Sequence, residues 1–587
     1  MALKRYAQLH PEKFFKGFLI FMLVINLLQA LLTGILFDEA YYWYFSQSMD
    51  WGYFDHPPMM ALLIKIGTVF SQEELGVRLL APFLYIGTVF LIWKMIDSPK
   101  KNAYVWLFAI LILATPLFTA YGFFLLPDTP LLFFSALFLF AYKQFLNKQS
   151  AINILLMAIA MAAMMYSKYH AVLLILGIML SNLNLLRNNY FWVSGITALL
   201  LFSPHLKWLY DTDFVTLEYH IGARAKPDFK IERPLTYLLT QVGIYGSIFV
   251  YFYWAFFKLK NSSLFIKGCK YGIATFLIVF LISSYNRNTQ AQWTIAAVVP
   301  FLIITFHFLV EHARLHKWFF RLAAINIVLI FIMRTFLADE RIPDGIVNSI
   351  NHTLNLENKI PLLKFETFGN EEWAEELRQK SGGIPVVFEN SYRDASMYRF
   401  YTGIPTYSIN NLHYRKNQFD IDSSEFSMQH KKIAFTSGFR RKSYDFTVSS
   451  KFKALRYYST ILDNFRSARK LTCVLSEEEI DLQREGPVPF VLYNPYEESI
   501  ALKDLKFHGV YTQKNQKILE QFPFAPIELT DNPKMVVKSK DSILLHFNIS
   551  RKPKTNAAKS FRIAIAEYGH VIGFQGTPVP LKYGIAE

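Results

Sequence analysis

The feature that most constrains this 587-residue chain is a series of long apolar segments that fills its first half. Segments of about 17 to 23 mostly apolar residues are long enough to cross a bilayer as helices, and about eleven occur here. They lie near 14–36, 76–96, 103–121, 130–146, 151–167, 169–186, 190–209, 235–257, 271–285, 292–310 and 317–337. The sequence therefore predicts a polytopic α-helical membrane bundle of about 11 spans.

The composition supports this class, with 53% hydrophobic and 17% aromatic residues. A net charge of +16 could suggest a nucleic-acid partner. However, the basic residues are spread over short loops between the apolar segments, as the positive-inside rule predicts. A nucleic-acid-binding protein would gather them in one patch, so we expect no nucleic-acid partner. The basic first 16 residues precede an apolar run too long for a signal-peptide core, so we expect a retained first span with a cytoplasmic N-terminus.

An odd number of spans places everything after about residue 340 on the outer side. We expect a transmembrane domain at 1–340, an α/β domain at 341–485 and a β-rich domain at 486–587. A helical pattern at 371–380 leads through two glycines to a strand pattern at 384–388, and alternating runs at 542–547 and 561–566 fit a β-sandwich. The only cysteines, Cys269 and Cys473, fall on opposite sides in this topology, so we expect no disulfide between them.

The outward loops hold an unusual share of the ionisable residues near membrane depth, where charge is costly unless it is paired or wetted. Because alternate loops of one bundle meet at one face, these groups could share a cavity. A carboxylate can take the proton of an attacking hydroxyl, and Lys, Arg or a metal can stabilise charge on a leaving phosphate. The candidates are Asp38, Glu39, Asp50, Asp55, His56, Asp128, Lys168, Glu218, His220, Arg224, Asn286, Arg287 and Gln290.

Each candidate also has a structural interpretation. Asp38 could cap a short interfacial helix, and Asp128 stands where a capping residue precedes a helix with proline in its first turn. Asp55 and His56 open an amphipathic run, and Lys168 could extend its ammonium outward along apolar surface. The aromatic residues between 41 and 53 could form an interfacial belt.

Several of these motifs resemble the GT-C polyprenyl-phosphate-sugar glycosyltransferases, in particular the bacterial branch similar to protein O-mannosyltransferases and the lipid A aminoarabinose transferase. The resemblance covers roughly residues 14 to 340. The residues that carry it are Phe37-Asp38-Glu39-Ala40-Tyr41-Tyr42-Trp43, Asp50-Trp51-Gly52-Tyr53-Phe54-Asp55-His56-Pro57-Pro58, Leu126-Pro127-Asp128-Thr129-Pro130 and Ser167-Lys168-Tyr169.

This resemblance implies a role for each group. Asp38, with Glu39 beside it, would be the base or the acceptor-orienting group, and Asp128 would be a second acidic residue of the site. Lys168 and Arg224 would bind the donor phosphate, and Arg287 is a further candidate for this role from a loop only loosely similar to the family. A divalent ion (Mg, Mn or Zn) would bind Asp55 and His220. The loop residues near the substrate would be Tyr41, Tyr42, Tyr53 and His56.

The family further implies a multi-pass protein of the bacterial inner membrane with its C-terminal region in the periplasm. The expected partners are a polyprenyl-phosphate-linked sugar donor, a lipid, glycan or protein acceptor, and membrane lipids. One departure stands out, because aminoarabinose transferases carry Lys where this chain has His56. Two other classes stay open from the residues alone: a transporter or flippase without bond chemistry, and a membrane anchor for a sensor tail.

Overall fold

The computed structural model describes residues 2–223, 229–260, 263–353, 361–440, 442–450, 455–484, 486–513, 517–527, 536–549, 551–568 and 571–583. The chain forms two compact units. We call Met1–Thr216 with Lys226–Phe368 the membrane unit, and Leu217–Ala225 with Gly369–Glu587 the C-terminal unit. The unit boundary after Phe368 lies later than the expected 340, because α19 packs against α18 and Glu366 accepts a hydrogen bond from the Phe37 backbone N–H.

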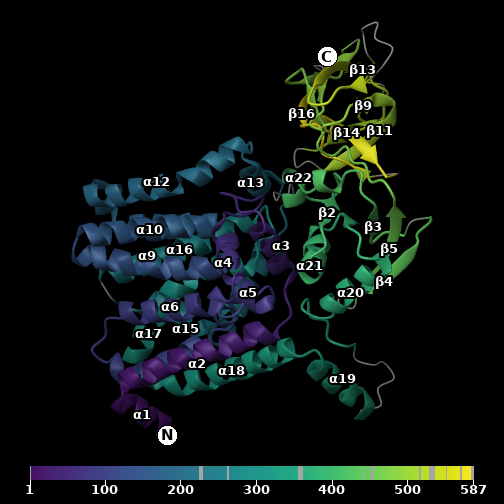
Figure 1. The fold of residues 1–587 in the computed structure, drawn as a ribbon. Helices are drawn as coiled ribbons and strands as arrows, with labels where there is room; N and C mark the ends of the chain where they lie inside the picture. The colour runs from purple at the N-terminus through teal and green to yellow at the C-terminus, as the bar shows by residue number, and fades with distance from the viewer. Residues whose placement is uncertain are drawn as a thin grey trace. The chain divides into compact units, whose positions relative to one another are not determined.

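Helices make up the membrane unit (Figure 1). They are α1 (Ala2–Leu9), α2 (Pro11–Leu32), α3 (Phe37–Ser46), α4 (Met59–Gly67), α5 (Glu74–Arg78), α6 (Leu80–Met95), α7 (Val105–Leu113), α8 (Pro116–Ala120), α9 (Asp128–Asn147), α10 (Ala151–Ser167), α11 (Val172–Ser181), α12 (Asn189–Asp211), α14 (Glu232–Tyr245), α15 (Phe249–Lys258), α16 (Leu264–Ser284), α17 (Val298–Glu311), α18 (His316–Ala338) and α19 (Arg341–Thr353). The short α13 (Val215–Glu218) crosses into the C-terminal unit.

Helices cover most of every apolar segment of the sequence, as predicted. Among the described residues, seven helices are long and apolar enough to cross a membrane. The run at 103–121 is interrupted, because it breaks into α7 and α8 before Pro116. The run at 235–257 is counted among the seven as Glu232–Lys258, although α14 ends before Gly246, whose φ is +59°. The number of eleven spans therefore stays a prediction, while the helical bundle is confirmed.

The helices pack in a continuous series, in which α12, α10, α9, α6, α2 and α18 follow one another as neighbours (Figure 1). The span Ala291–Glu311 contains α17 and lies at the centre of the bundle. Its most apolar 18-residue stretch is 100% buried inside the protein. By contrast, the span Ala313–Ala338 contains α18, and only 17% of its most apolar 18-residue stretch is buried inside the protein. An apolar helix so little covered by protein is suited to contact lipid.

The C-terminal unit begins with an α/β portion. It contains α20 (Asn370–Ser381), α21 (Tyr392–Thr402) and α22 (Gln418–Ile421) with a sheet in the order β2-β1-β3-β5-β4. Its strands are β1 (Val386–Glu389), β2 (Thr406–Ile409), β3 (Ile433–Ser437), β4 (Phe446–Ser450) and β5 (Leu455–Leu462). The predicted helix at 371–380 and strand at 384–388 are confirmed as α20 and β1.

A β-sandwich follows, as predicted. Its sheets are β11-β10-β14-β16-β7, with β15 beside β14, and β13-β8-β6, while β12 pairs with β9. The strands are β6 (Thr472–Leu475), β7 (Ile480–Asp481), β8 (Val488–Tyr493), β9 (Ile500–Ala501), β10 (Lys506–Thr512), β11 (Ile518–Pro523), β12 (Val536–Val537), β13 (Ser542–Phe547), β14 (Ser560–Glu567), β15 (Val571–Ile572) and β16 (Val579–Lys582). Because β6 and β7 pair with strands later in the chain, the sandwich begins before the expected residue 486.

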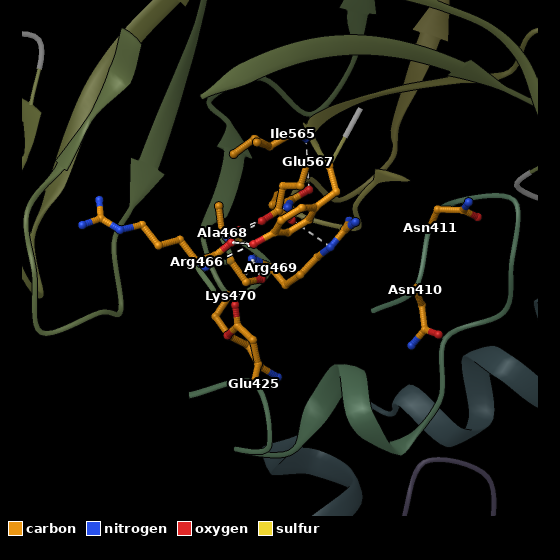
Figure 2. Close-up of polar contacts among 12 residues, drawn as sticks. Asn410, Asn411, Glu425, Arg466, Ala468, Arg469, Lys470, Ile565 and Glu567 are labelled. Carbon is orange, nitrogen blue, oxygen red and sulfur yellow. Dashed lines mark hydrogen bonds and ion pairs between the residues drawn. The ribbon is translucent and has the colours of Figure 1, made fainter. Parts of the chain in front are cut away.

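Buried polar contacts join the α/β portion to the sandwich (Figure 2). Glu425 accepts hydrogen bonds from the Tyr496 hydroxyl at 2.6 Å and the Arg469 backbone N–H at 3.2 Å. Arg469 Nε lies 2.9 Å from Glu567 Oε2, and Glu567 also accepts from the Ala468 N–H at 2.6 Å. These contacts explain why the two regions predicted as separate domains form one compact unit.

Candidate active site

The clearest candidate site in the membrane unit is an ion pair at one end of the α9–α10 hairpin. The Lys168 Nζ lies 2.7 Å from Asp128 Oδ1, and the Tyr121 hydroxyl donates to Asp128 Oδ2 at 3.2 Å. Since α9 begins at Asp128 and antiparallel α10 ends at Ser167, the hairpin brings the two residues together from forty positions apart. The sequence identified both residues but not their pairing.

The capping interpretation of Asp128 is wrong. Pro127 occupies the N-cap position of α9, and no side chain caps this helix end. The carboxylate is instead committed to Lys168 and Tyr121, with 4% of the residue exposed. Lys168 in turn has an extended backbone after the last turn of α10, which frees its side chain from the helix surface. The structure thus fixes an ammonium group at the end of the bundle.

Glu39 forms a second ion pair, with Arg78 of α5. Arg78 Nε donates to Glu39 Oε1 at 2.9 Å, Nη2 lies 2.5 Å from Oε2, and both side chains are fully buried. Glu39 also accepts from the backbone N–H groups of Leu36 at 3.1 Å and Leu125 at 3.0 Å. This buried pairing favours a structural role for Glu39, and its catalytic use stays a prediction.

Arg78 is a residue that sequence reasoning missed. Its guanidinium also donates to the carbonyl groups of Thr33 and Gly34, and so holds the chain that follows α2. The available signal was a single arginine within an apolar stretch directly after an acidic loop. Such a buried cation requires a buried anion, which is Glu39.

Asp38 lies in the first turn of α3 and is half-buried. The predicted short helix exists, but Leu36 is its N-cap residue, so the capping interpretation of Asp38 is also wrong. Its neighbour Glu39 binds Leu125, three positions before Asp128. The first turn of α3 and the first turn of α9 are therefore tied to the same end of the membrane unit.

The loop from residue 47 to 58 is held by α12. The Trp208 indole donates to Asp50 Oδ2 at 2.9 Å. His205 Nδ1 lies 2.6 Å from the Trp51 carbonyl, and its Nε2 lies 2.8 Å from the Tyr169 hydroxyl. Because a carbonyl only accepts, Nδ1 carries the proton and Nε2 accepts from Tyr169. His205 and Trp208 were not predicted, since they lie far along the chain within an apolar segment.

The aromatic residues of this region form packing and not an interfacial belt. Tyr41, Tyr42 and Tyr53 are all buried, and the Phe45 and Tyr53 rings stack at 4.4 Å between centroids. His56 Nε2 lies 2.9 Å from the Tyr42 hydroxyl. Only Trp51, at 55% exposure, fits the predicted belt among the aromatic residues at 41–44, 51 and 53.

Two cavities accompany these residues in the membrane unit. The first, of 360 Å³, lies between the 49–51 segment, the start of α4 and Tyr166. The second, of 470 Å³, lies along α8, α14 and α18 and is lined mainly by apolar side chains, with Asn326 and Arg334 among them. Both adjoin helices rich in apolar surface and are large enough for part of a lipid chain.

The remaining predicted residues are not brought together in this unit. His220 belongs to the segment Leu217–Ala225 of the C-terminal unit, whereas Asp55 is buried in the membrane unit. Arg287 is half-buried in the turn between α16 and α17, and Arg224 lies outside the described residues. Among the described residues, no group of three or more His, Cys, Asp or Glu side chains is placed to hold a metal. Because Asp55 and His220 belong to different units, the ion site expected of them stays a prediction.

Comparisons with known proteins cover different shares of the chain. A family model described as dolichyl-phosphate-mannose-protein mannosyltransferase matches residues 55–208, which include Asp128 and Lys168. The lipid A galacturonosyltransferase RgtD of Rhizobium johnstonii is 25% identical over 239 residues, or 39% of this chain and 50% of that protein. The chain thus matches about half the length of this curated relative.

Solved structures extend the likeness to the fold. The crystal structures of ArnT from Cupriavidus metallidurans, apo and bound to undecaprenyl phosphate, match with TM-scores of 0.54 and 0.51 at 13% identity. Each comparison covers 76% of this chain, and 98% and 97% of the respective ArnT chains. The chain is therefore a multi-pass membrane protein with the fold of ArnT, similar over residues 55–208 to the dolichyl-phosphate-mannose-protein mannosyltransferases.

Proposed function

We propose that the protein is an integral membrane glycosyltransferase that moves a sugar from a polyprenyl-phosphate carrier to a lipid, glycan or protein acceptor. The observation that carries the proposal is the Lys168 ammonium, held by Asp128 at the end of the α9–α10 hairpin. This pair lies in the stretch similar to mannosyltransferases. The names of RgtD, a lipid A galacturonosyltransferase, and of ArnT bound to undecaprenyl phosphate support the same donor and a lipid acceptor.

In this proposal Lys168 stabilises the departing phosphate, and Asp128 with Tyr121 positions the ammonium. Asp38 takes the proton of the acceptor hydroxyl. The acceptor oxygen bonds to the anomeric carbon, the bond from that carbon to the phosphate oxygen breaks, and polyprenyl phosphate leaves with the electron pair. One displacement of this kind inverts the anomeric centre. The apolar 470 Å³ cavity along α18 suits an isoprenoid segment of the carrier.

The orientation belongs to the same proposal. Basic residues such as Lys4, Lys100 and Lys101 lie at the bundle end opposite the candidate site in the topology set by the positive-inside rule. We therefore place the N-terminus in the cytoplasm, the transfer at the outer face of a bacterial inner membrane, and the C-terminal unit in the periplasm. Metal dependence stays a prediction: we route no step through an ion, and activity after chelation, with and without Mg, Mn or Zn, tests it.

The central test is Asp38→Asn, introduced into a strain that lacks the wild-type gene. We expect loss of the sugar from the cell's lipids or glycoproteins, measured by mass spectrometry against parent and deletion strains. General-base assistance is typically worth ~10²–10⁴-fold, so the residual modification should be near the deletion level. Asp50→Asn, which changes a carboxylate bound to Trp208, is a control for altered loop charge.

A fully active Asp38→Asn protein would overturn the role of Asp38. The whole proposal would fail if purified protein in vesicles moved a polyprenyl-linked sugar across the bilayer without cleaving it, because that result identifies a transporter. Binding of undecaprenyl phosphate to the purified Asp38→Asn protein should be unchanged, which separates a lost chemical step from lost folding.

A further inference from the structure

A buried arginine of the C-terminal unit lies on the outer face of the β-sandwich. Side chains of β14 alternate, so Phe561, Ile563 and Ile565 enter the sandwich core while Arg562 faces the other side with Ala564. Val510 is its register partner on β10 and is fully buried. Arg562 is 4% exposed. The aliphatic part of its side chain therefore lies beside a small apolar cluster of Val510, Ala564 and Ile572, against which Leu412 of the α/β portion packs.

Arg562 has no neutralising partner in the described part of the chain. Its Nε is buried without a hydrogen-bond partner, and the side chain makes no ion pair with any described residue. Burial lowers the pKa of Arg562 to about 10, and Glu218 acts in the opposite direction from a distance. A buried cation without a partner is costly, so its presence calls for an explanation in terms of a missing anion.

Lys416 is a second cation at the same place. It is half-buried, its Nζ lies 5.4 Å from the centre of the Phe574 ring, and it has no hydrogen bond or ion pair to any other described residue. Burial lowers the pKa of Lys416, and the nearby Arg562 lowers it further, while Asp420 and Glu218 raise it. The Leu412 backbone N–H donates to the Ile572 carbonyl at 2.9 Å, and β15 pairs with β14, so the two cations come from neighbouring segments.

The nearest carboxylate of the α/β portion is already used. Asp420 Oδ2 accepts from the Asn410 amide at 2.9 Å and from the Asn417 backbone N–H at 2.8 Å. The exposed Glu218 belongs to the 217–223 segment, which is fixed beside Lys416 by a hydrogen bond from Arg415 to the Tyr219 hydroxyl. Glu218 has interactions of its own, and within the described part of the chain no ion pair joins Arg562 or Lys416 to a carboxylate.

We propose that Arg562 and Lys416 form an anion site that binds a phosphate group. A guanidinium presents paired N–H donors that match phosphate oxygens, and a lysine adds a mobile point charge. The site lies wholly within the C-terminal unit and does not depend on the glycosyl transfer proposed above. The ligand is either free phosphate or a phosphorylated sugar, because both present the same phosphate oxygens to the two cations.

The test uses the purified full-length protein and hydrogen–deuterium exchange of the peptides that cover 410–420 and 560–566. Orthophosphate is added while sodium chloride keeps the ionic strength constant. At phosphate about ten times above its dissociation constant, we expect roughly tenfold slower exchange in both peptides of the wild type. Arg562→Met and Lys416→Met should lose this protection. Lys506→Met, which removes an exposed charge from neighbouring β10, should keep it.

Stability without phosphate separates a ligand site from a structural arginine. Because Arg562→Met removes an unpaired buried cation, its melting temperature should equal or exceed that of the wild type without phosphate, and the order should reverse when phosphate is added. Glucosamine 1-phosphate serves as the second probe: tighter binding than orthophosphate identifies a sugar phosphate, and equal binding identifies phosphate alone.

Two results would overturn the proposal. One is no protection of the wild type by either probe. The other is the same protection in wild type, Lys416→Met and Arg562→Met, which would identify both as structural cations only. Should Arg562→Met fail to fold, the half-buried Lys416→Met still decides the outcome, since its side chain can be shortened without opening the apolar cluster.

Discussion

Two carboxylate–cation pairs lie at the same end of the membrane unit, and their surroundings differ. Glu39 and Arg78 are completely buried, and Glu39 accepts additional backbone hydrogen bonds. The Asp128 side chain is 6% exposed and the Lys168 side chain is 11% exposed. Among the described residues, the Lys168 ammonium forms an ion pair with one carboxylate, that of Asp128. The first pair fastens chain segments together. The second leaves an ammonium able to meet a substrate, which is why we assign chemistry to it.

The largest expected effect comes from Lys168→Met. Loss of one preorganised cation that stabilises a leaving group should lower transfer by about 10²–10³-fold while the melting temperature changes little. The measurement is modification of the natural acceptor by mass spectrometry in the deletion strain, at matched protein levels. Lys168→Arg keeps the charge and should retain more activity. Equal activity of wild type and Lys168→Met would contradict the catalytic role that we assign to the Asp128–Lys168 pair.

Arg78→Met should show the reverse pattern, a large loss of stability. Removal of one partner from a buried pair typically costs about 3–5 kcal/mol because the other charge stays buried alone. Thermal melting and the folded fraction in size-exclusion chromatography measure this loss. The double variant Glu39→Gln with Arg78→Met should recover part of it. If Arg78→Met melted like wild type, the pair would not fasten the loop as described.

Gly52→Ala should have a smaller effect through the loop that α12 holds. A Cβ at residue 52 would lie 2.3 Å from the Trp208 ring, so the indole would have to move from its bond with Asp50. Overpacking of this kind costs about 1–3 kcal/mol, seen as a lower melting temperature. Gly17→Ala is the matched control, because nothing lies within 4 Å of that position.

The smallest effect on transfer is expected from pH acting on the C-terminal unit. Burial raises the pKa of Asp420 to about 6 and that of Glu425 to about 7. The folded state therefore holds these protons more tightly, so their stabilisation is complete below about pH 4 and is lost as pH rises to about 7. Exchange protection of the 420–430 peptides, corrected for intrinsic rates, should fall over this range. Glu425→Gln should make exchange protection less dependent on pH. Protection that rises between about pH 4 and pH 7 would contradict the prediction.

Sequence reasoning identified most elements that depend on local pattern. The apolar segments, α20, β1, β13 and β14 all appear where their periodicity and flanking glycines predict them. Asp38, Asp128 and Lys168 were also identified, because ionisable groups beside apolar spans are conspicuous in a sequence. The residues that were missed, Arg78, His205 and Trp208, act on partners far away along the chain, as in the bond from Trp208 to Asp50.

A helical membrane bundle followed by α/β and β-sandwich regions could be predicted from the amino-acid sequence, because apolar length and periodicity are local properties. Which charges meet became clear from the packing of the folded chain. That packing pairs Asp128 with Lys168, buries Glu39 with Arg78, and places Lys416 and Arg562 on neighbouring segments without an ion pair to a described carboxylate. Burial and partner choice arise from the packing of distant segments, and no pattern of neighbouring residues records them.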